Sequence, residues 1–352
     1  MAPKISICVP NLNTRPFLPE RFRTIQEQTF QDWELLIYDS YSEDGAWQYI
    51  QEFVGGEPRA RCWQGPREGT PGSWSACIRE ARGEYVYIAT SDDTMAPDCL
   101  EKLTAALDAH PECGLAHCQL RPIDEKGNVR DDLTAWWTEH SVFASSSGPL
   151  RDAVHIRKAP YDGLLHLLGE SPYISITELL IRRSLFERVG LFSSAWGSVG
   201  DFNWNMRAGL IANTIHVPDT WGGWRCHPGQ ATAAAALQSD GHFSKIDGMI
   251  DHAIDAVRHH LGPEVRAGLQ KKWVAEARAL RMFEREVAPK RPPAREAFVL
   301  WHAVTGSTPA RIHATSSLRH RPFTDLIARW LSTAGVERAL IPVHGATAMA
   351  VA

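Results

Sequence analysis

Short apolar runs alternate with segments of helical spacing through the first 120 residues, and this alternation constrains the fold more than any other feature. Strands that alternate with helices are typical of a mostly parallel sheet with helices on both faces, so we predict an α/β fold. The predicted strands are Ile5–Val9, Trp33–Tyr38, Arg59–Trp63, Tyr85–Ala89 and Cys113–Leu120, and the predicted helices are Phe17–Thr29, Ala46–Val54, Ser73–Arg82 and Pro97–His110.

The remainder of the chain has a less regular pattern. We expect residues 1–240 to form one α/β domain with halves at about 1–120 and 121–240, followed by a helical region at 241–340 and a flexible tail at 341–352. Strands are predicted at Ile174–Ile181 and Thr214–Val217, a loop near a ligand at Trp221–Gln230, and helices at Arg183–Val189, Asp201–Ile211, Ile246–His260, Pro263–Glu286, Ala294–Val304 and Phe323–Ala334.

Charge and cysteine content bound the cellular context. The formal net charge of −4 argues against a nucleic-acid partner, because proteins that bind nucleic acids usually carry a basic excess. The seven cysteines form no Cys-x-x-Cys pair, which favours a reducing compartment. Neither a signal-peptide core nor an apolar run of about 18 residues is found. We therefore expect a cytoplasmic protein and leave a peripheral membrane contact open.

Polar residues follow several of the predicted strands. Ligands in such sheets bind beyond the carboxyl ends of the strands, which draws attention to Asn11, Asn13 and Asp39. The segment Thr90–Asp93 ends in two adjacent carboxylates, which repel each other and usually have a cation or strong donors nearby. Oxygen ligands suit Mg²⁺ or Mn²⁺ bound to a phosphate group. These acids would equally favour the dipole of the helix that starts at Pro97, and both interpretations stay open.

Three further segments have both a chemical and a structural interpretation. The acidic turn Asp39–Gly45 suits a nucleoside, although a plain turn with a helix cap explains it too. Asp201 stands at a predicted helix start, where it could be a cap or a catalytic group. His227 is followed by Pro228 and Gly229, so it lies outside any regular helix and could be a metal ligand or an ordinary loop histidine.

Taken together and in this order, these segments resemble family 2 glycosyltransferases, which have the GT-A fold. The resemblance covers roughly residues 4–232. It is carried by Val9–Asn13, Gln28–Leu35, Asp39 with Ser42–Gly45, Arg67–Gly69 with Ser75, Ala81–Tyr85, Asp92-Asp93 with Pro97 and Leu100, Gly200-Asp201 and Arg225-x-His227. The chain departs from the family pattern where Ser40 and Thr90 replace a frequent Asp, Arg67 and Ser75 a frequent Asn, and Gly200 a usual Glu.

The resemblance implies an inverting, metal-dependent transfer of sugar to an acceptor hydroxyl. Asp201 would be the catalytic base, and Asp92, Asp93 and His227 would hold Mn²⁺ or Mg²⁺. The donor would be a nucleotide sugar, most often a UDP-sugar, bound by the first half of the domain. Its predicted contacts are Pro10, Asn13, Asp39, Arg67, Asp92 and Arg225. The second half would bind a glycan, a lipid-linked molecule or a small molecule as acceptor.

Two other classes of protein remain as alternatives. One is a nucleotide-sugar-binding protein without transferase activity, because the chain departs from the family pattern. The other is a nucleotidyltransferase, which would be expected to have a glycine-rich basic loop after the first strand, whereas Asn11–Pro16 has no glycine. The aromatic residues Trp196, Trp204, Trp221 and Trp224 could stack on sugars or pack in the core.

Overall fold

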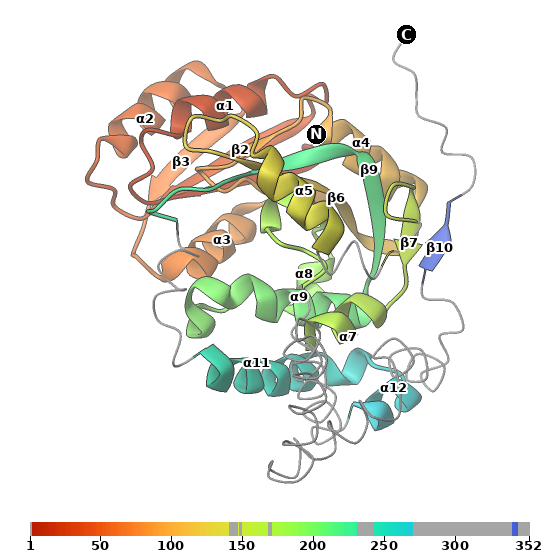
Figure 1. Cartoon of the computed structure of the whole chain (residues 1–352). Coiled ribbons are helices and arrows are strands. Elements are labelled where there is room, and N and C mark those ends of the chain that lie inside the picture. Colours follow the sequence, from red (N-terminus) through yellow and green to blue (C-terminus); the bar gives the residue numbers. More distant parts are fainter. Residues whose placement is uncertain are drawn as a thin grey trace, which may run out of the picture.

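The computed structural model describes residues 2–140, 147, 150–167, 171–230, 242–269 and 340–343. Within this part of the chain, one mixed sheet of ten strands crosses the molecule (Figure 1). The strands are β1 (Ile5–Asn11), β2 (Trp33–Asp39), β3 (Ala60–Gln64), β4 (Tyr85–Ile88), β5 (Thr94–Met95), β6 (Cys113–Ile123), β7 (His155–Arg157), β8 (Leu179–Arg182), β9 (Asn213–Arg225) and β10 (Leu340–Pro342). Their order is β10-β7-β9-β6-β8-β4-β1-β2-β3, and the short β5 pairs with β9.

Strand β1 lies at the centre of a parallel block. It pairs in parallel with β2 on one side and with β4 on the other, and β3 extends the block beyond β2. All seven residues of β1 are buried, as expected for a strand covered on both faces. The register pairs Asn11 with Asp39, so the polar ends of β1 and β2 meet at one edge of the sheet. The predicted α/β fold is therefore confirmed.

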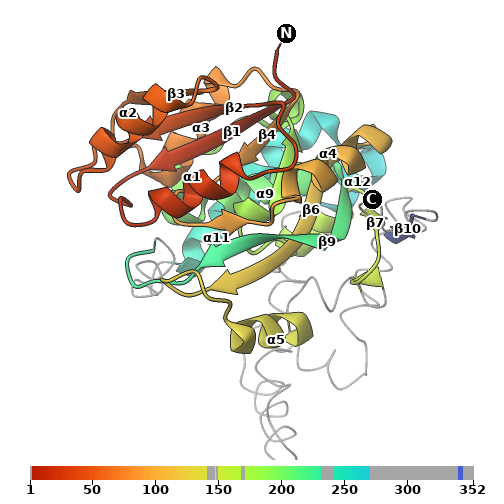
Figure 2. The same cartoon turned by 90° about the horizontal axis from the view of Figure 1, so that it is seen from above.

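Helices cover both faces of the sheet (Figures 1 and 2). On one face, α1 (Leu18–Gln26), α2 (Ala46–Gly56) and α4 (Cys99–Ala109) pack on the sheet through residues such as Phe22, Ile50 and Leu103. The opposite face carries α3 (Gly69–Glu80), α8 (Leu185–Val189) and α9 (Gly200–Ile211), with Trp204 fully buried among them. Each apolar stripe is buried against the sheet, which is the main source of stability for such layers.

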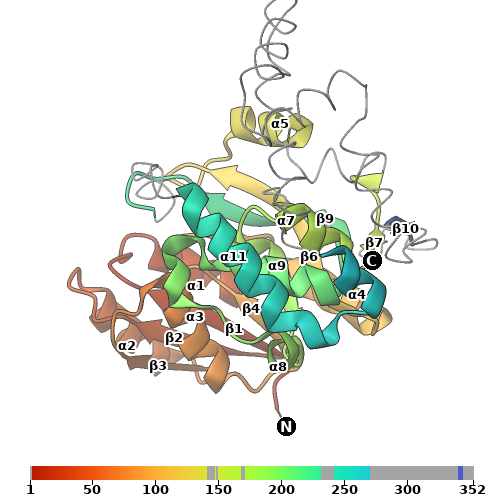
Figure 3. The ribbon, with the colours of Figure 1, turned by 90° about the horizontal axis from the view of Figure 1, so that it is seen from below.

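A further helical layer packs on α9. It consists of α7 (Tyr161–Leu167) and α11 (His242–Val257), and Figure 3 shows α11 crossing this face of the molecule. A Cβ added to Gly209 would lie 2.4 Å from the backbone nitrogen of Gly163, so α7 and α9 are in direct backbone contact. The remaining described helices are α5 (Asp131–His140), α12 (Pro263–Gly268) and the 3₁₀ turns η2 (Ile176–Glu178), η3 (Ser194–Val199) and η5 (Arg258–His260).

Two predictions from the sequence need correction. The segment Ile174–Ile181 is not one strand, because a capping box between Ser175 and Glu178 closes a 3₁₀ turn before β8 begins. The predicted loop Trp221–Gln230 is a strand as far as Arg225, since β9 continues beside β6.

Several predictions fall on residues without a description. The predicted helices at Ala294–Val304 and Phe323–Ala334, most of Pro263–Glu286 and the tail after residue 343 lie outside the described residues. Among the residues that are described, we find no helix with the length and apolar character needed to cross a membrane.

Candidate active site

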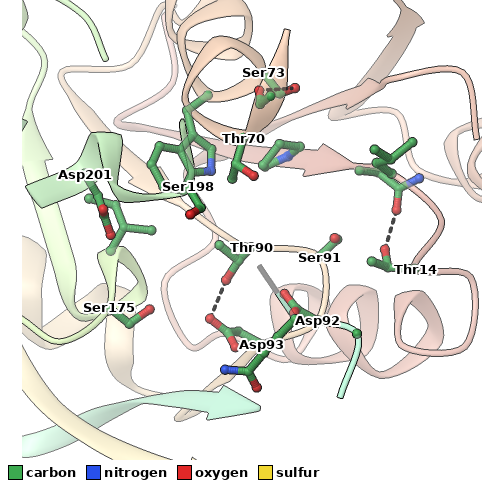
Figure 4. Close-up of a pocket in the computed structure, with 18 of the residues that line it drawn as sticks. Thr14, Thr70, Ser73, Thr90, Ser91, Asp92, Asp93, Ser175, Ser198 and Asp201 are labelled. Atoms are coloured by element: carbon green, nitrogen blue, oxygen red, sulfur yellow. Dashed lines mark hydrogen bonds between the residues drawn. The ribbon is translucent and has the colours of Figure 1, made fainter. Parts of the chain in front are cut away.

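A cavity of about 510 Å³ opens beyond the carboxyl ends of β1 and β4 (Figure 4). This is the edge of the sheet where the sequence predicts ligand binding. The cavity is lined by Pro10, Asn11, Leu12, Thr14, Ser40, Arg67, Gly69, Thr70, Ser73, Trp74, Thr90, Ser91, Asp92, Asp93, Ile174, Ser175, Ile176, Ser198, Asp201, Trp224, His227, Gly229 and Gln230.

The two adjacent aspartates after β4 have different surroundings. Asp93 is 3% exposed, and its carboxylate accepts hydrogen bonds from the Arg225 backbone N–H at 2.9 Å and from the Thr90 hydroxyl. Burial, with the neighbouring charge of Asp92, raises the pKa of Asp93 to about 7. The Asp92 carboxylate is more open to the cavity, and its Oδ2 lies 3.0 Å from His227 Nε2. Asp92 is therefore the more available ligand of the two.

Asp92 and His227 form a pair of donors suited to a divalent cation. A carboxylate oxygen and an imidazole nitrogen face each other on the cavity wall, and the Phe17 ring packs against the imidazole with ring centroids 4.8 Å apart. In the described part of the chain, no group of three or more His, Cys, Asp or Glu side chains is placed to hold a metal ion. A cation bound by Asp92 and His227 would therefore need further ligands from the nucleotide sugar or from water.

The sequence predicts that Arg225 contacts the nucleotide sugar, but the structure places its side chain away from the cavity. Its side chain is 1% exposed and does not line the cavity. Its guanidinium donates to the Asp92 carbonyl at 2.6 Å and to the Glu20 carboxylate at 2.5 Å, and also bonds the carbonyls of Asp124 and Glu125. Arg225 therefore stabilises the loop that carries Asp92 and Asp93, from the side away from the cavity.

Asp39 likewise stabilises the backbone, in this case the turn that follows β2. It is fully buried, and its two oxygens accept bonds from Asn11 Nδ2, the Ser42 hydroxyl, the Ser42 backbone N–H and Gln64 Nε2, at 2.6–3.0 Å. Asn13 has a positive φ of 55° and accepts a bond from the Glu43 N–H, so it holds the same turn. Neither residue lines the cavity.

Three of the predicted contacts with the nucleotide sugar do reach the cavity, namely Asp92, Pro10 and Arg67. Pro10 lines it from the end of β1, and Arg67 lines it from the loop before α3. The Arg67 guanidinium is anchored by the carbonyls of Ser40 and Tyr41, at 3.0 and 2.7 Å, and by the Glu43 carboxylate. This anchoring holds the guanidinium at the cavity wall with its charge paired to Glu43, and guanidinium N–H groups suit phosphate oxygens.

Asp201 lies on the opposite side of the cavity from Asp92 in the view of Figure 4. It occupies the first turn of α9, where its Oδ1 accepts the Phe202 N–H at 2.8 Å. Burial raises the pKa of Asp201 to about 6. A half-buried carboxylate with such a pKa can take up a proton close to neutral pH.

The comparison with sequence families identifies the chain. Residues 6–190 match the family described as Glycosyl transferase family 2, which is more than half of the 352 residues. The chain belongs to glycosyl transferase family 2. This membership supports the predicted glycosyltransferase activity over a binding protein without activity and over a nucleotidyltransferase.

Curated relatives of this chain match it over shorter stretches. The GalNAc(5)-diNAcBac-PP-undecaprenol beta-1,3-glucosyltransferase of Campylobacter jejuni is 28% identical over 134 residues, which cover 38% of this chain and 42% of that protein. The chondroitin synthase of Escherichia coli is 26% identical over 134 residues, covering 38% and 20%. The chain thus spans less than half of the length of these two relatives.

Solved structures of other glycosyltransferases share the GT-A fold of this chain. The Staphylococcus aureus TarS 1–349 complex with UDP-GlcNAc has a TM-score of 0.54 at 14% identity and covers 90% of this chain and 92% of that one. The mannosyltransferase PcManGT from Pyrobaculum calidifontis, solved with GDP-Man and Mn²⁺, has a TM-score of 0.51 at 19% identity, with 96% and 87% covered. At these identities the likeness concerns the fold alone.

The sequence does not predict several of the residues that line the cavity. Trp74 and Ser198 come from α3 and η3, and Ser175 from the turn before β8. No local motif marks them, because each reaches the cavity only through the fold. Of the four tryptophans singled out in the sequence, Trp224 alone lines this cavity, whereas Trp204 is a core residue.

Proposed function

We propose that this glycosyltransferase moves a sugar from a nucleotide-diphosphate sugar to an acceptor hydroxyl by a metal-dependent single displacement that inverts the anomeric carbon. The observation that carries the proposal is that one cavity is lined both by Asp92 with His227 and by Asp201. Asp92 and His227 suit a cation bound to the diphosphate, and Asp201 is suited to accept a proton.

At the donor end, Asp92 and His227 would hold the cation, and Asp93 with Arg225 would keep their loop in place. A bound cation neutralises the charge that develops on the leaving diphosphate. The imidazole favours Mn²⁺ over Mg²⁺, since Mg²⁺ prefers an all-oxygen shell. Arg67 carries a positive charge at the same cavity, where it would contact the nucleotide diphosphate.

At the acceptor end, Asp201 would take the proton of the acceptor hydroxyl. As that proton leaves, the acceptor oxygen forms a bond to the anomeric carbon, and the bond between this carbon and the diphosphate oxygen breaks. The two oxygens stand on opposite faces of the sugar, so the configuration inverts. The pKa of Asp201 near 6 leaves the carboxylate ionised at neutral pH and basic enough to accept a proton.

We propose a UDP-sugar as the donor, with GDP-mannose as the second choice, because the similar structures were solved in complex with UDP-GlcNAc and with GDP-Man. Glycans, lipid-linked molecules and small molecules all stay open as acceptors. We further propose that about residues 1–120 bind the donor, that residues 121–240 bind the acceptor and that the protein is cytoplasmic.

Calorimetric titration with UDP-, GDP- and dTDP-sugars, with and without Mn²⁺, tests the proposal directly. We expect Mn²⁺-dependent binding of one nucleotide class, loss of that dependence in Asp92→Ala, and no change in Glu52→Ala, since Glu52 is an exposed carboxylate on α2. If the folded protein binds none of these nucleotides, or if Asp92→Ala keeps the full metal dependence, the donor site is wrongly assigned.

A further inference from the structure

A buried carboxylate holds the part of the cavity wall formed by Ile174, Ser175 and Ile176. Glu178 Oε1 accepts the backbone N–H groups of Ile174 at 3.0 Å and of Ser175 at 2.7 Å. The bond from the Ser175 N–H forms one side of the capping box that closes the 3₁₀ turn η2. Figure 4 draws Ser175 on the same side of the cavity as Asp201. The position of this wall therefore depends on Glu178.

The other oxygen of Glu178 begins a chain of buried polar groups. Glu178 Oε2 lies 2.8 Å from His117 Nε2, and His117 Nδ1 lies 3.1 Å from His216 Nδ1. His216 Nε2 in turn lies 3.0 Å from the backbone carbonyl oxygen of Arg151. The three side chains are at most 3% exposed. These three buried side chains thus link β6 and β9 to the turn η2 behind the cavity wall.

The three contacts require one more proton than two neutral imidazoles and an ionised carboxylate would carry. Each of the three contacts needs one hydrogen between its two heavy atoms, and the Arg151 carbonyl can only accept. Two neutral imidazoles bring one ring hydrogen each, and an ionised carboxylate brings none. The third hydrogen must therefore sit on Glu178 or on one of the histidines.

The surroundings place this hydrogen on Glu178. Burial raises the pKa of Glu178 to about 8, and burial lowers the pKa of His117 and of His216 well below the ordinary range. The positive charge of Arg157 opposes the shift at Glu178, and the negative charge of Asp93 adds to it. The titratable groups that face the three residues are Arg157 and His155 on β7, Tyr173, Cys118 on β6 and Asp93, and Arg157 is itself paired with Asp162 on α7.

We propose that Glu178 is a positioning residue that works as a neutral carboxylic acid. Its Oε1 holds the backbone of the cavity wall, and its protonated Oε2 donates to His117, which donates to His216. Protonation lets a buried acid make all these bonds without an uncompensated charge. This wall lies on the Asp201 side of the cavity, where it would serve the acceptor if the proposed function holds, whereas the protonation of Glu178 does not depend on that function.

The variant Glu178→Gln separates a protonated acid from an ionised one. An amide N–H replaces the O–H, and the amide oxygen still accepts the two backbone N–H groups. In an infrared difference spectrum at pH 7 between wild type and Glu178→Gln, we expect a protonated carboxyl band that belongs to wild type alone. The absence of that band would overturn the proposal, because it would leave the extra proton on a histidine.

The pH dependence of thermal unfolding gives a second readout. An ordinary glutamate releases its proton near pH 4.5 in the unfolded chain, whereas folded Glu178 keeps it to about pH 8. Stability that depends on this proton is present below pH 4.5 and is lost as the pH rises to 8. The Tm of wild type should therefore fall more steeply with pH over this window than the Tm of Glu178→Gln. Equal slopes would contradict the assignment.

Donor hydrolysis tests the positioning role. With UDP-GlcNAc or GDP-mannose and Mn²⁺, we expect Glu178→Gln to hydrolyse the donor within about threefold of wild type. We expect Glu178→Ala to lose at least about tenfold in kcat with unchanged nucleotide binding, because it releases two backbone N–H groups of the wall. If Glu178→Gln is as impaired as Glu178→Ala, the neutral-acid role is refuted. If wild type hydrolyses neither of these donors nor any other UDP-, GDP- or dTDP-sugar, the proposed function fails, while the infrared and unfolding measurements still decide the state of Glu178.

Discussion

Replacing Asp201 by Asn tests the catalytic proposal at its most specific point. The change removes the proton acceptor and keeps the shape, and Asn Oδ1 can still accept the Phe202 N–H that Asp201 accepts at 2.8 Å. The start of α9 should therefore stay intact. A positioned general base contributes roughly 10²–10⁴-fold to the rate, so we expect kcat to fall by that factor. The nucleotide should bind as in wild type.

The pH profile identifies the group more sharply than the loss of rate does. The base works only when ionised, and burial sets the pKa of Asp201 at about 6. The rate should therefore fall about tenfold for each pH unit below 6, with roughly a tenth of the carboxylate ionised at pH 5. The residual activity of Asp201→Asn should lack this acidic limb.

Release of free nucleotide from the donor, followed between pH 5 and 8, is a suitable assay. Asp255→Asn is a matched control, because Asp255 lies on α11 with 57% of its side chain exposed. Turnover within a few-fold of wild type in Asp201→Asn would refute the assignment of the base. An acidic limb that persists in this variant would point to another carboxylate, and Asp93, with a pKa of about 7, would then be the first to test.

Three further changes have clear expected outcomes. His227→Ala should raise the Mn²⁺ concentration needed for nucleotide binding by about tenfold or more, measured by calorimetry, since it removes one of two protein donors. Gly209→Ala should lower the free energy of unfolding by about 1–3 kcal/mol, because its Cβ would lie 2.4 Å from a backbone nitrogen of α7, whereas Gly55→Ala has open space and serves as control. Glu20→Gln should cost about 1–2 kcal/mol in denaturant unfolding, since it removes the ion-pair partner of buried Arg225 but is itself one-third exposed.

The sequence predicts β1, β2 and β4 well because each is a largely apolar stretch with polar residues at its end or just after it. Asp39 and Asp92 were placed at one edge of the sheet from this pattern alone, and the structure has them there. The continuation of β9 was missed because Gly222 and Gly223 suggested a loop. These glycines are needed since a Cβ would lie 2.5 Å from the Thr177 carbonyl oxygen and 2.1 Å from the Thr94 hydroxyl.

The place of Arg225 could not be derived from the sequence, since its partners lie far away along the chain. The ion pair joins it to Glu20 across 205 positions, and the Asp124 carbonyl is 101 positions away. Only the completed sheet brings these groups together. The role of Glu178 was hidden for the same reason, because His117 reaches it from β6 and His216 reaches His117 from β9.

Strand β8 determines when the sheet can close during synthesis. It pairs with β4 through Val86 and Ile181 and with β6 through Ala116 and Leu180. The parallel block therefore keeps an unpaired edge at β4 until about a hundred further residues have been made, and such an edge can pair with other chains. A fragment that ends near residue 120 would keep this edge open permanently. The donor half should consequently aggregate when it is expressed alone.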